Sequence, residues 1–218
     1  MDPLSWLVQF VLHLDTELPD LISQYGTWVY VFLFLIVFCE TGLVVTFFFP
    51  GDSLIFAAGA LAAMGSFNVW LLFLVFAGAA ILGDTANYWM GHYFGPRLFK
   101  KDDSRIFRKD YLGKAHMFYE RHGAETIVLA RFVPVIRTFA PFVAGMGEMN
   151  YRKFIAYNIL GGLLWVTLFL SIGYLVGNQP FVQDNFGIVL IVMMLISFLP
   201  MVYEVVTEWR RARREKAQ

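Results

Sequence analysis

The chain has 218 residues, of which 58% are hydrophobic and only 16% charged, and its formal net charge is zero. Charged residues make up about 25% of a typical soluble domain, so this composition excludes an ordinary soluble protein. Residues 154–177 and 186–203 contain no charged side chain, and each stretch is close to the roughly 20 residues that cross a bilayer as a helix. We therefore predict an all-α integral membrane protein.

The first predicted element is an amphipathic helix within residues 1–27, which mix apolar positions with Asp2, Asp15, Glu17 and Asp20. A helix of this kind lies at a membrane surface. The segment contains no Lys or Arg, whereas a secretory signal peptide begins with a basic region, so we do not expect cleavage. Its acidic character places it on the periplasmic side, because cytoplasmic segments are the ones enriched in Lys and Arg.

Seven further segments follow along the chain. They are predicted as a broken apolar stretch, a transmembrane helix, a basic loop, a second broken stretch, two more transmembrane helices and a basic tail, at residues 28–64, 67–96, 97–122, 124–147, 151–177, 186–209 and 210–218. Pro50 and Gly51 break the first stretch, and Pro134 and Pro141 interrupt the second. Because proline ends or kinks a helix, we predict hinges at these four residues.

The basic loop and the basic tail both belong in the cytoplasm by the positive-inside rule. If residues 28–49 and 67–93 each crossed once, the basic loop would lie on the same side as the acidic N-terminus. We therefore predict that residues 28–64 form a re-entrant hairpin entering from the outer face, and that residues 124–147 form one entering from the cytoplasm. Residues 28–49 are also long enough to span alone, with residues 53–64 returning, and the sequence leaves this alternative open.

A hairpin followed by a crossing helix then occurs twice, with opposite orientations. Irregular backbone at membrane depth is tolerated only where it is buried in protein or lines a wet cavity, so the two hairpin tips should meet in the middle. Inverted repeats with broken helices are typical of secondary transporters, whose sites lie at the midplane between the repeats. The chain is thus predicted as a single multi-pass membrane domain with a periplasmic N-terminus and a cytoplasmic C-terminus.

Three carboxylates inside the apolar segments are candidate site residues: Glu40 and Asp52 in the first broken stretch, and Asp84 in the next helix. Charges in hydrocarbon cost about 2.5–3.5 kcal/mol each on insertion scales and usually mark a functional site. Burial disfavours a charged carboxylate unless a cation is near, so these groups could gain and lose protons in a proton-coupled step. The alternative is structural: Asp52 caps the helix that starts at Ser53, Glu40 pairs with an arginine, and Asp84 is solvated near the interface.

Two arginines, Arg131 and Arg137, flank Pro134 in the second broken stretch. Positions i and i+6 do not face each other on an unbroken helix, but the break at the proline lets both point at one centre. Guanidinium binds phosphate in a bidentate fork and stays protonated when buried, so we predict that both bind a lipid phosphate; the alternative is an ion pair with the first-hairpin carboxylates. Asn158 is predicted as a further contact, although polar and aromatic residues such as Asn158 and Trp165 more often serve helix packing.

Several kinds of site lack support in the sequence. His92, His116 and His122 have no metal-ligand spacing with nearby acids, so neither a metal nor a cofactor is predicted. Ser53 lacks a base at a plausible spacing, so the chain is not expected to be an enzyme. The single cysteine excludes an intrachain disulfide, and the zero net charge gives no reason to predict a nucleic-acid partner.

These residues fall into motifs that resemble the DedA family, which belongs to the SNARE-associated Golgi protein superfamily and shares its VTT domain. The resemblance covers nearly the whole chain. The motifs that carry it are Glu40-Thr41-Gly42, Phe49-Pro50-Gly51-Asp52-Ser53, Gly83-Asp84 with Asn87-Tyr88 and Gly91, Arg131-Phe132-Val133-Pro134, Arg137-Thr138, Ala144-Gly145, and Asn158 with Gly161, Trp165, Gly173-Tyr174 and Gly177. Phe47 stands where the family usually has a proline, which weakens the case for a second break in the first hairpin.

The resemblance implies two opposed re-entrant hairpins and transport of a lipid. Members of the family are associated with the return of undecaprenyl phosphate across the bacterial inner membrane, with phospholipid scrambling in eukaryotic relatives, and with dependence on the proton-motive force. The acidic and arginine positions essential in the family correspond to Glu40, Asp52, Arg131 and Arg137.

We therefore predict an inner-membrane flippase for an anionic polyprenyl phosphate, coupled to protons. The predicted partners are an anionic membrane lipid and protons, and the sequence leaves open whether the chain forms a homo-oligomer. Four other functions stay open: a phospholipid scramblase that needs no gradient, a small-cation/proton antiporter, a membrane lipid phosphatase, and a structural assembly factor.

Overall fold

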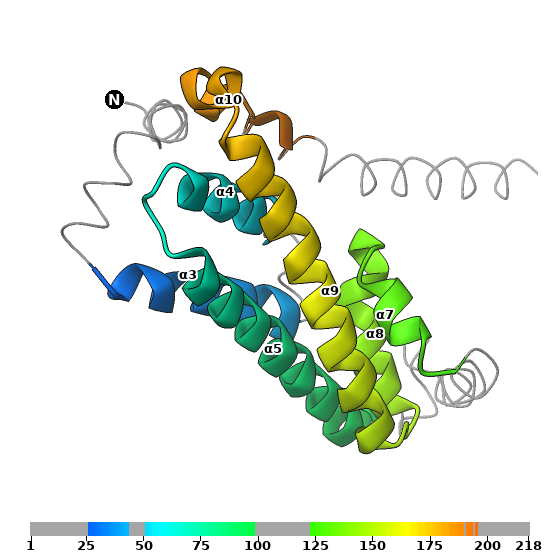
Figure 1. Cartoon of the computed structure of the whole chain (residues 1–218). Helices are drawn as coiled ribbons and strands as arrows, with labels where there is room; N and C mark the ends of the chain where they lie inside the picture. The colour runs from blue at the N-terminus through cyan, green and yellow to red at the C-terminus, as the bar shows by residue number, and fades with distance from the viewer. Residues whose placement is uncertain (1–25, 44–50, 99–122, 190, 194, 196–218) are drawn as a thin grey trace, which may run out of the picture.

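The computed structural model describes residues 26–43, 51–98, 123–189, 191–193 and 195. The regular secondary structure of these residues is helical, with no strand among them (Figure 1). The helices are α3 (Trp28–Gly42), α4 (Gly51–Ala63), α5 (Val69–Leu98), α7 (Thr126–Ala130), α8 (Pro134–Met146), α9 (Tyr151–Gly177) and α10 (Pro180–Asp184). The predicted amphipathic helix, the basic loop, the tail and most of the third transmembrane segment fall outside the described residues.

The two longest helices, α5 and α9, match the transmembrane segments predicted at residues 67–96 and 151–177. Their apolar portions, Val69–Gly95 and Tyr151–Gly177, each contain 27 residues and have mean hydropathies of 1.9 and 2.1. Each is therefore long and apolar enough to cross a bilayer. With 15 and 13 residues, α3 and α4 are only about 20 Å long, shorter than the hydrocarbon core of about 30 Å.

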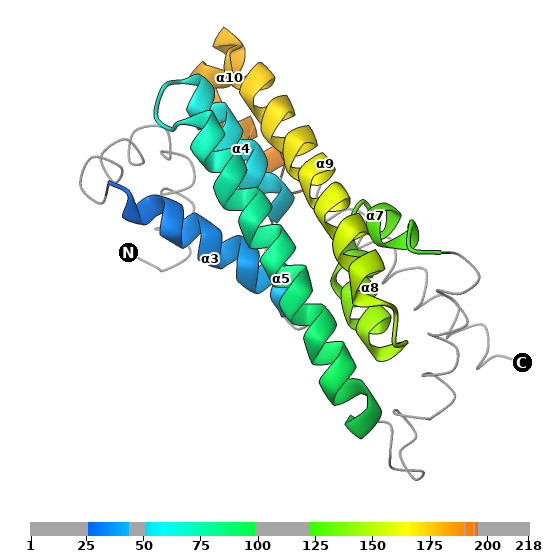
Figure 2. The ribbon, with the colours of Figure 1, turned by 60° about the horizontal axis from the view of Figure 1, so that its bottom comes forward.

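The helices pack in a crossed order rather than in chain order. α4 lies along α9 and α8 lies along α5, while α3 packs on α5, α7 packs on α9, and the two long helices also touch each other (Figures 1 and 2). Each broken segment therefore has its second helix against the long helix of the other half of the chain. This exchange brings residues from both halves to the centre of the molecule.

Glycines allow the two exchanged helix pairs to approach closely. A Cβ added to Gly173 of α9 would overlap the backbone of Phe56 in α4. The corresponding contact in the other pair joins Gly91 of α5 to the backbone of Phe142 in α8. Small residues are the usual means of close helix packing in membranes, and both interfaces use glycine in this way.

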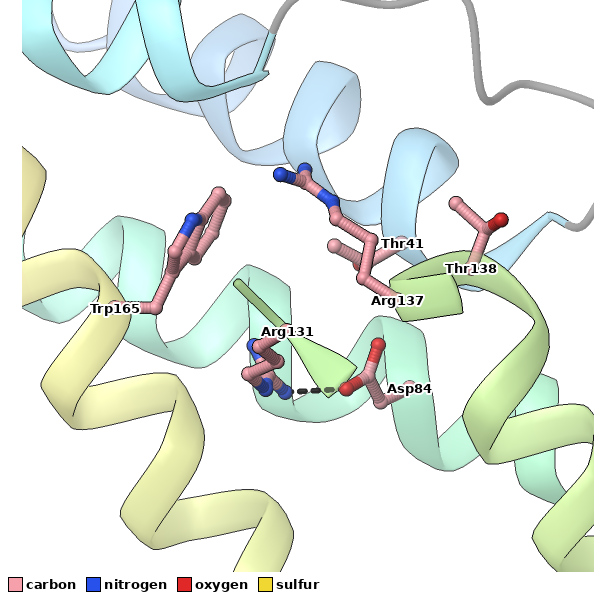
Figure 3. A pocket seen from close by; sticks show the side chains of 6 residues that line it. All are labelled: Thr41, Asp84, Arg131, Arg137, Thr138 and Trp165. Atoms are coloured by element: carbon pink, nitrogen blue, oxygen red, sulfur yellow. Dashed lines mark hydrogen bonds and ion pairs between the residues drawn. The ribbon is translucent and has the colours of Figure 1, made fainter. Parts of the chain in front are cut away.

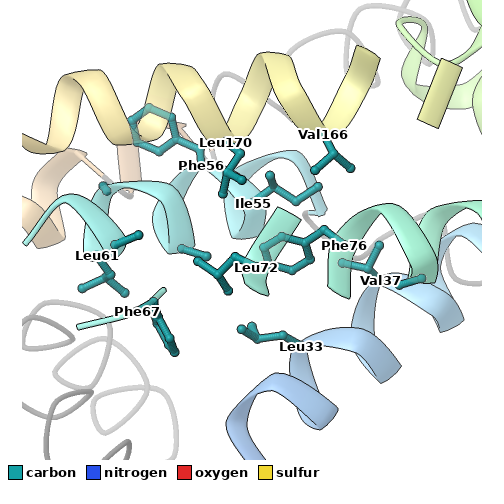
Figure 4. Close-up of a cluster of buried hydrophobic side chains, with 14 of the residues drawn as sticks. Leu33, Val37, Ile55, Phe56, Leu61, Phe67, Leu72, Phe76, Val166 and Leu170 are labelled. Atoms are coloured by element: carbon teal, nitrogen blue, oxygen red, sulfur yellow. The ribbon is translucent and has the colours of Figure 1, made fainter. Parts of the chain in front are cut away.

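The main apolar core lies between α3, α4, α5 and α9 (Figure 4). The residues labelled there come from all four helices and, for Phe67, from the link between α4 and α5: Leu33, Val37, Ile55, Phe56, Leu61, Phe67, Leu72, Phe76, Val166 and Leu170. The outer surfaces of the long helices are also apolar, with Trp70 76% exposed and Leu74 67% exposed. An exposed apolar surface of this extent fits contact with lipid rather than with water.

The second broken stretch breaks where proline predicts it. α7 ends at Ala130, Val133 has extended backbone (φ −114°, ψ 109°), and α8 begins at Pro134. Proline suits the first position of a helix, because its missing N–H has no intrahelical partner there. Pro141, also predicted as a hinge, lies inside α8, which continues through it. In the first stretch Gly51 is the first residue of α4, and Pro50 lies outside the described residues.

Candidate functional site

The predicted site residues lie on five helices and the short link between two of them. Glu40 is in the last turn of α3, and Asp52 is in the first turn of α4. Asp84 lies in the middle of α5, and Asn158 lies in α9. The two arginines lie on either side of the extended link at Val133, at the end of α7 and in the first turn of α8.

Arg137 is held by two carboxylates from different helices. One end nitrogen, Nη2, donates to Glu40 Oε1, and the other, Nη1, donates to Asp52 Oδ1. The Trp165 indole Nε1 donates to the same Asp52 oxygen at 2.9 Å, and the Arg137 Cζ lies 4.7 Å from the centroid of the Trp165 ring. The Glu40 and Arg137 side chains are 4% and 9% exposed, and that of Asp52 is 19% exposed.

Arg131 has a separate set of partners. Its Nη2 donates to Asp84 Oδ2 and to Asn158 Oδ1. The Asn158 amide is itself fixed, because its Nδ2 donates to the Ile81 carbonyl at 3.0 Å and to Thr85 Oγ1 at 3.4 Å. Asp84 is 3% exposed and Asn158 is fully buried, so this ion pair lies between α5, α7 and α9 with little access for solvent.

Both arginines line one cavity together with Thr41, Asp84, Thr138 and Trp165 (Figure 3). In Figure 3 the Arg137 guanidinium lies beside the Trp165 ring, and Arg131 is joined to Asp84 on the opposite wall. The space open to the centre of a water molecule is about 10 Å³, which is about what one water needs. The cavity therefore has no room for a phosphate group in this arrangement.

The structure brings the predicted residues together, but it pairs the arginines with different carboxylates from those expected. The sequence offered Glu40 and Asp52 as partners for both arginines, whereas only Arg137 contacts them. Arg131 pairs instead with Asp84, so Asp84 belongs to the site and is not solvated. The pairing follows from the helix packing, since α7 lies on α9 and α9 touches α5.

Sequence reasoning missed the role of two polar groups. Asn87 is fully buried in α5, and its Nδ2 donates to the Thr41 carbonyl at 3.2 Å and to the Thr138 carbonyl at 2.7 Å, which ties α5 to α3 and α8. Trp165, first interpreted as a packing residue, contacts the ion pair directly. Asn87 lies three residues after Asp84 and therefore on the same face of α5. This spacing is a sequence feature from which its place at the site could have been predicted.

The fold and the site define a class: a helical membrane protein whose buried ion pairs lie between exchanged helices. Comparison with known proteins gives the family. Residues 49–175 match the model of the VTT domain, and the chain is 53% identical to Protein DedA of Escherichia coli K12 over 98% of this chain and 99% of that protein. The chain belongs to the DedA family of VTT-domain proteins.

More distant relatives carry similarly general names. The chain is 42% identical to an uncharacterized membrane protein of Mycobacterium leprae, covering 76% of this chain and 74% of the relative. It is 32% identical to the inner membrane protein YqjA of E. coli, covering 83% of this chain and 81% of the relative. These names state a membrane location and no catalytic activity. No solved structure matches the chain.

Proposed function

We propose that the protein is a flippase that moves an anionic polyprenyl phosphate, such as undecaprenyl phosphate, across the bacterial inner membrane. The observation that carries the proposal is the coordination of Arg137. Each of its two end nitrogens donates a hydrogen bond to a carboxylate oxygen, and the two carboxylates come from different helices. Phosphate binds a guanidinium in the same two-pronged way, so a lipid phosphate can replace the carboxylates on Arg137.

The proposed architecture is a pair of inverted repeats, each made of a re-entrant hairpin and a crossing helix. One repeat contains α3, α4 and α5, and the other contains α7, α8 and α9. Two observations support this: the pairs α4–α9 and α8–α5 exchange partners in the same way, and both have glycine contacts to backbone, at Gly173 and Gly91. The site then lies where the repeats meet, as in other transporters of this build.

Charge balance at Arg137 supports coupling to protons. One guanidinium faces two carboxylates, so the group has an excess negative charge if both are ionised. An unbalanced charge is costly in a buried site, and one bound proton on Glu40 or Asp52 removes it. We therefore propose that a proton on this pair accompanies the release of Arg137. A phosphate monoester, with up to two negative charges, can then take the place of the two carboxylates.

Transport in proteoliposomes tests the proposal. A fluorescent short-chain polyprenyl phosphate is loaded into one leaflet, and its transfer is measured with and without a pH difference. Arg137→Ala should reduce transfer at least about tenfold, because the charge-assisted contact to phosphate is lost. Arg152→Ala is the matched control, since Arg152 is an exposed arginine in the first turn of α9. Equal transfer by wild type and Arg137→Ala would contradict the proposal.

A second candidate function, small-cation/proton antiport, is favoured by the same excess negative charge. A monovalent cation could neutralise the Glu40 and Asp52 pair in place of a proton. In that case Arg137 is structural, and Arg137→Lys should keep activity because it keeps the charge. Cation flux that persists in Arg137→Lys, without any lipid transfer by wild type, would favour the antiporter. A scramblase would transfer lipid at the same rate with and without a pH difference.

A further inference from the structure

Trp165 contacts both Asp52 and Arg137 at the centre of the site. It lies in the middle of α9, is 2% exposed, and lines the cavity (Figure 3). Its indole Nε1 donates to Asp52 Oδ1 at 2.9 Å. Its ring faces the Arg137 guanidinium, whose Cζ is 4.7 Å from the ring centroid. A residue that only fills space in a helix interface would need neither contact.

The indole N–H and the guanidinium converge on a single oxygen atom. Asp52 Oδ1 accepts from Trp165 Nε1 and also from Arg137 Nη1. The two donors come from different helices, α9 and α8. An indole N–H can only donate, and a buried donor without an acceptor is costly. If Asp52 leaves this position, another oxygen must therefore take its place for both donors.

We propose that Trp165 is a second donor for the phosphate group of the transported lipid. Its N–H and Arg137 bind the same phosphate oxygen, at the position that Asp52 Oδ1 now occupies. The aromatic face meanwhile keeps the guanidinium in place while its carboxylate partners are exchanged, because a cation–π contact does not require the anion. This inference rests on the proposed function, and it adds to it a specific neutral donor on the crossing helix.

Binding of dodecyl phosphate to the full-length protein in dodecyl maltoside micelles tests the inference. Trp165→Phe keeps an aromatic ring beside Arg137 and removes only the N–H. We expect it to bind dodecyl phosphate about tenfold more weakly than wild type, the effect of one hydrogen bond to a charged group. Trp70→Phe is the matched control, because Trp70 is 76% exposed near the start of α5 and should leave the affinity unchanged.

A second measurement on the wild type covers the case in which Trp165→Phe does not fold. With the tryptophans ¹⁵N-labelled, the Trp165 indole N–H signal is assigned by replacing the other five in turn, since the chain has six tryptophans. Dodecyl phosphate should shift this signal, and neutral dodecanol should not. A Trp165→Phe protein that binds dodecyl phosphate as wild type does, or an indole signal that does not move when wild type binds, overturns this inference alone. Wild type that does not bind dodecyl phosphate overturns the proposed function as well.

Discussion

The two buried arginines line one cavity, yet their surroundings differ in charge. Arg131 has one carboxylate partner, Asp84, and one neutral amide partner, so its positive charge is balanced. Arg137 has two carboxylate partners and an aromatic face, so its surroundings carry an excess negative charge when both are ionised. A balanced buried pair is stable as it stands, whereas an unbalanced one favours the arrival of another positive charge.

The two groups also differ in where their partners lie along the helices. Asp84 is in the middle of α5, and Asn158 is within α9. The regular hydrogen bonds of these two helices fix both positions. The carboxylates on Arg137 come from the last turn of α3 and the first turn of α4. Helix ends open more easily than helix middles. We infer that the Arg131 group is a fixed anchor and that the Arg137 group is the one that changes partners.

Removing the carboxylate of the anchor should have the largest effect on stability. Asp84→Ala leaves the Arg131 guanidinium buried without an ionic partner, and breaking a buried pair on one side costs about 3–5 kcal/mol. The measurement is the midpoint of thermal unfolding in detergent, together with the yield of folded protein. Asp184→Ala is the control, because Asp184 is an exposed carboxylate at the end of α10.

The double variant Asp84→Leu with Arg131→Met sharpens the same experiment. Replacing both charges by apolar side chains removes the unpaired charge, so most of the lost stability should return. If the single variant Asp84→Ala is as stable as wild type, this carboxylate does not anchor Arg131. The distinction between the Arg131 group and the Arg137 group would then fail.

Two glycine substitutions compare the rigidity of the groups. A Cβ at Gly161 would lie 3.1 Å from Arg131 Cδ and 3.3 Å from the Val128 Cα. Because backbone is among the atoms in the way, Gly161→Ala should cost about 1–3 kcal/mol through overpacking. The three atoms nearest a Cβ at Gly51 all belong to the carboxylate end of the Glu40 side chain. This flexible end can shift more easily than backbone, so Gly51→Ala should cost less stability and mainly reduce lipid transfer.

Chemical denaturation of both variants and the proteoliposome assay provide the comparison. If Gly51→Ala proves as destabilising as Gly161→Ala, the side of the site formed by α3 and α4 is as rigid as the anchor. Transfer at the wild-type rate by Gly51→Ala would show that the Glu40 position does not matter for transport.

The sequence predicted the features of this fold and site that depend on local properties of the chain, and it did not predict those that depend on contacts between distant helices. Segment length and hydropathy predicted α5 and α9, and proline predicted the break before α8, because these are local properties of the chain. The choice of partner for each arginine depends on which helices pack together, and no local pattern encodes that choice. Asp84 meets Arg131 only because α7 and α5 both contact α9. The same holds for Trp165, whose contact with Asp52 joins residues 113 positions apart.

The smallest effect on stability is expected where the charge is already in excess. Glu40→Gln removes one of two carboxylates from Arg137 while keeping an oxygen that can accept its hydrogen bond, so the free energy of unfolding should change by no more than about 1 kcal/mol. Under the proposed function, transport should nevertheless lose its response to a pH difference, since the excess charge proposed to attract the proton is gone. Asp84→Asn should do the opposite: it leaves Arg131 without an ionic partner and lowers stability, while any remaining lipid transfer still responds to pH. Transfer rates with and without a pH difference, measured in parallel with unfolding for both variants, separate the two patterns. A Glu40→Gln protein that keeps the full pH response would assign the proton to another group, and a pH response lost only in Asp84→Asn would exchange the roles of the two arginines.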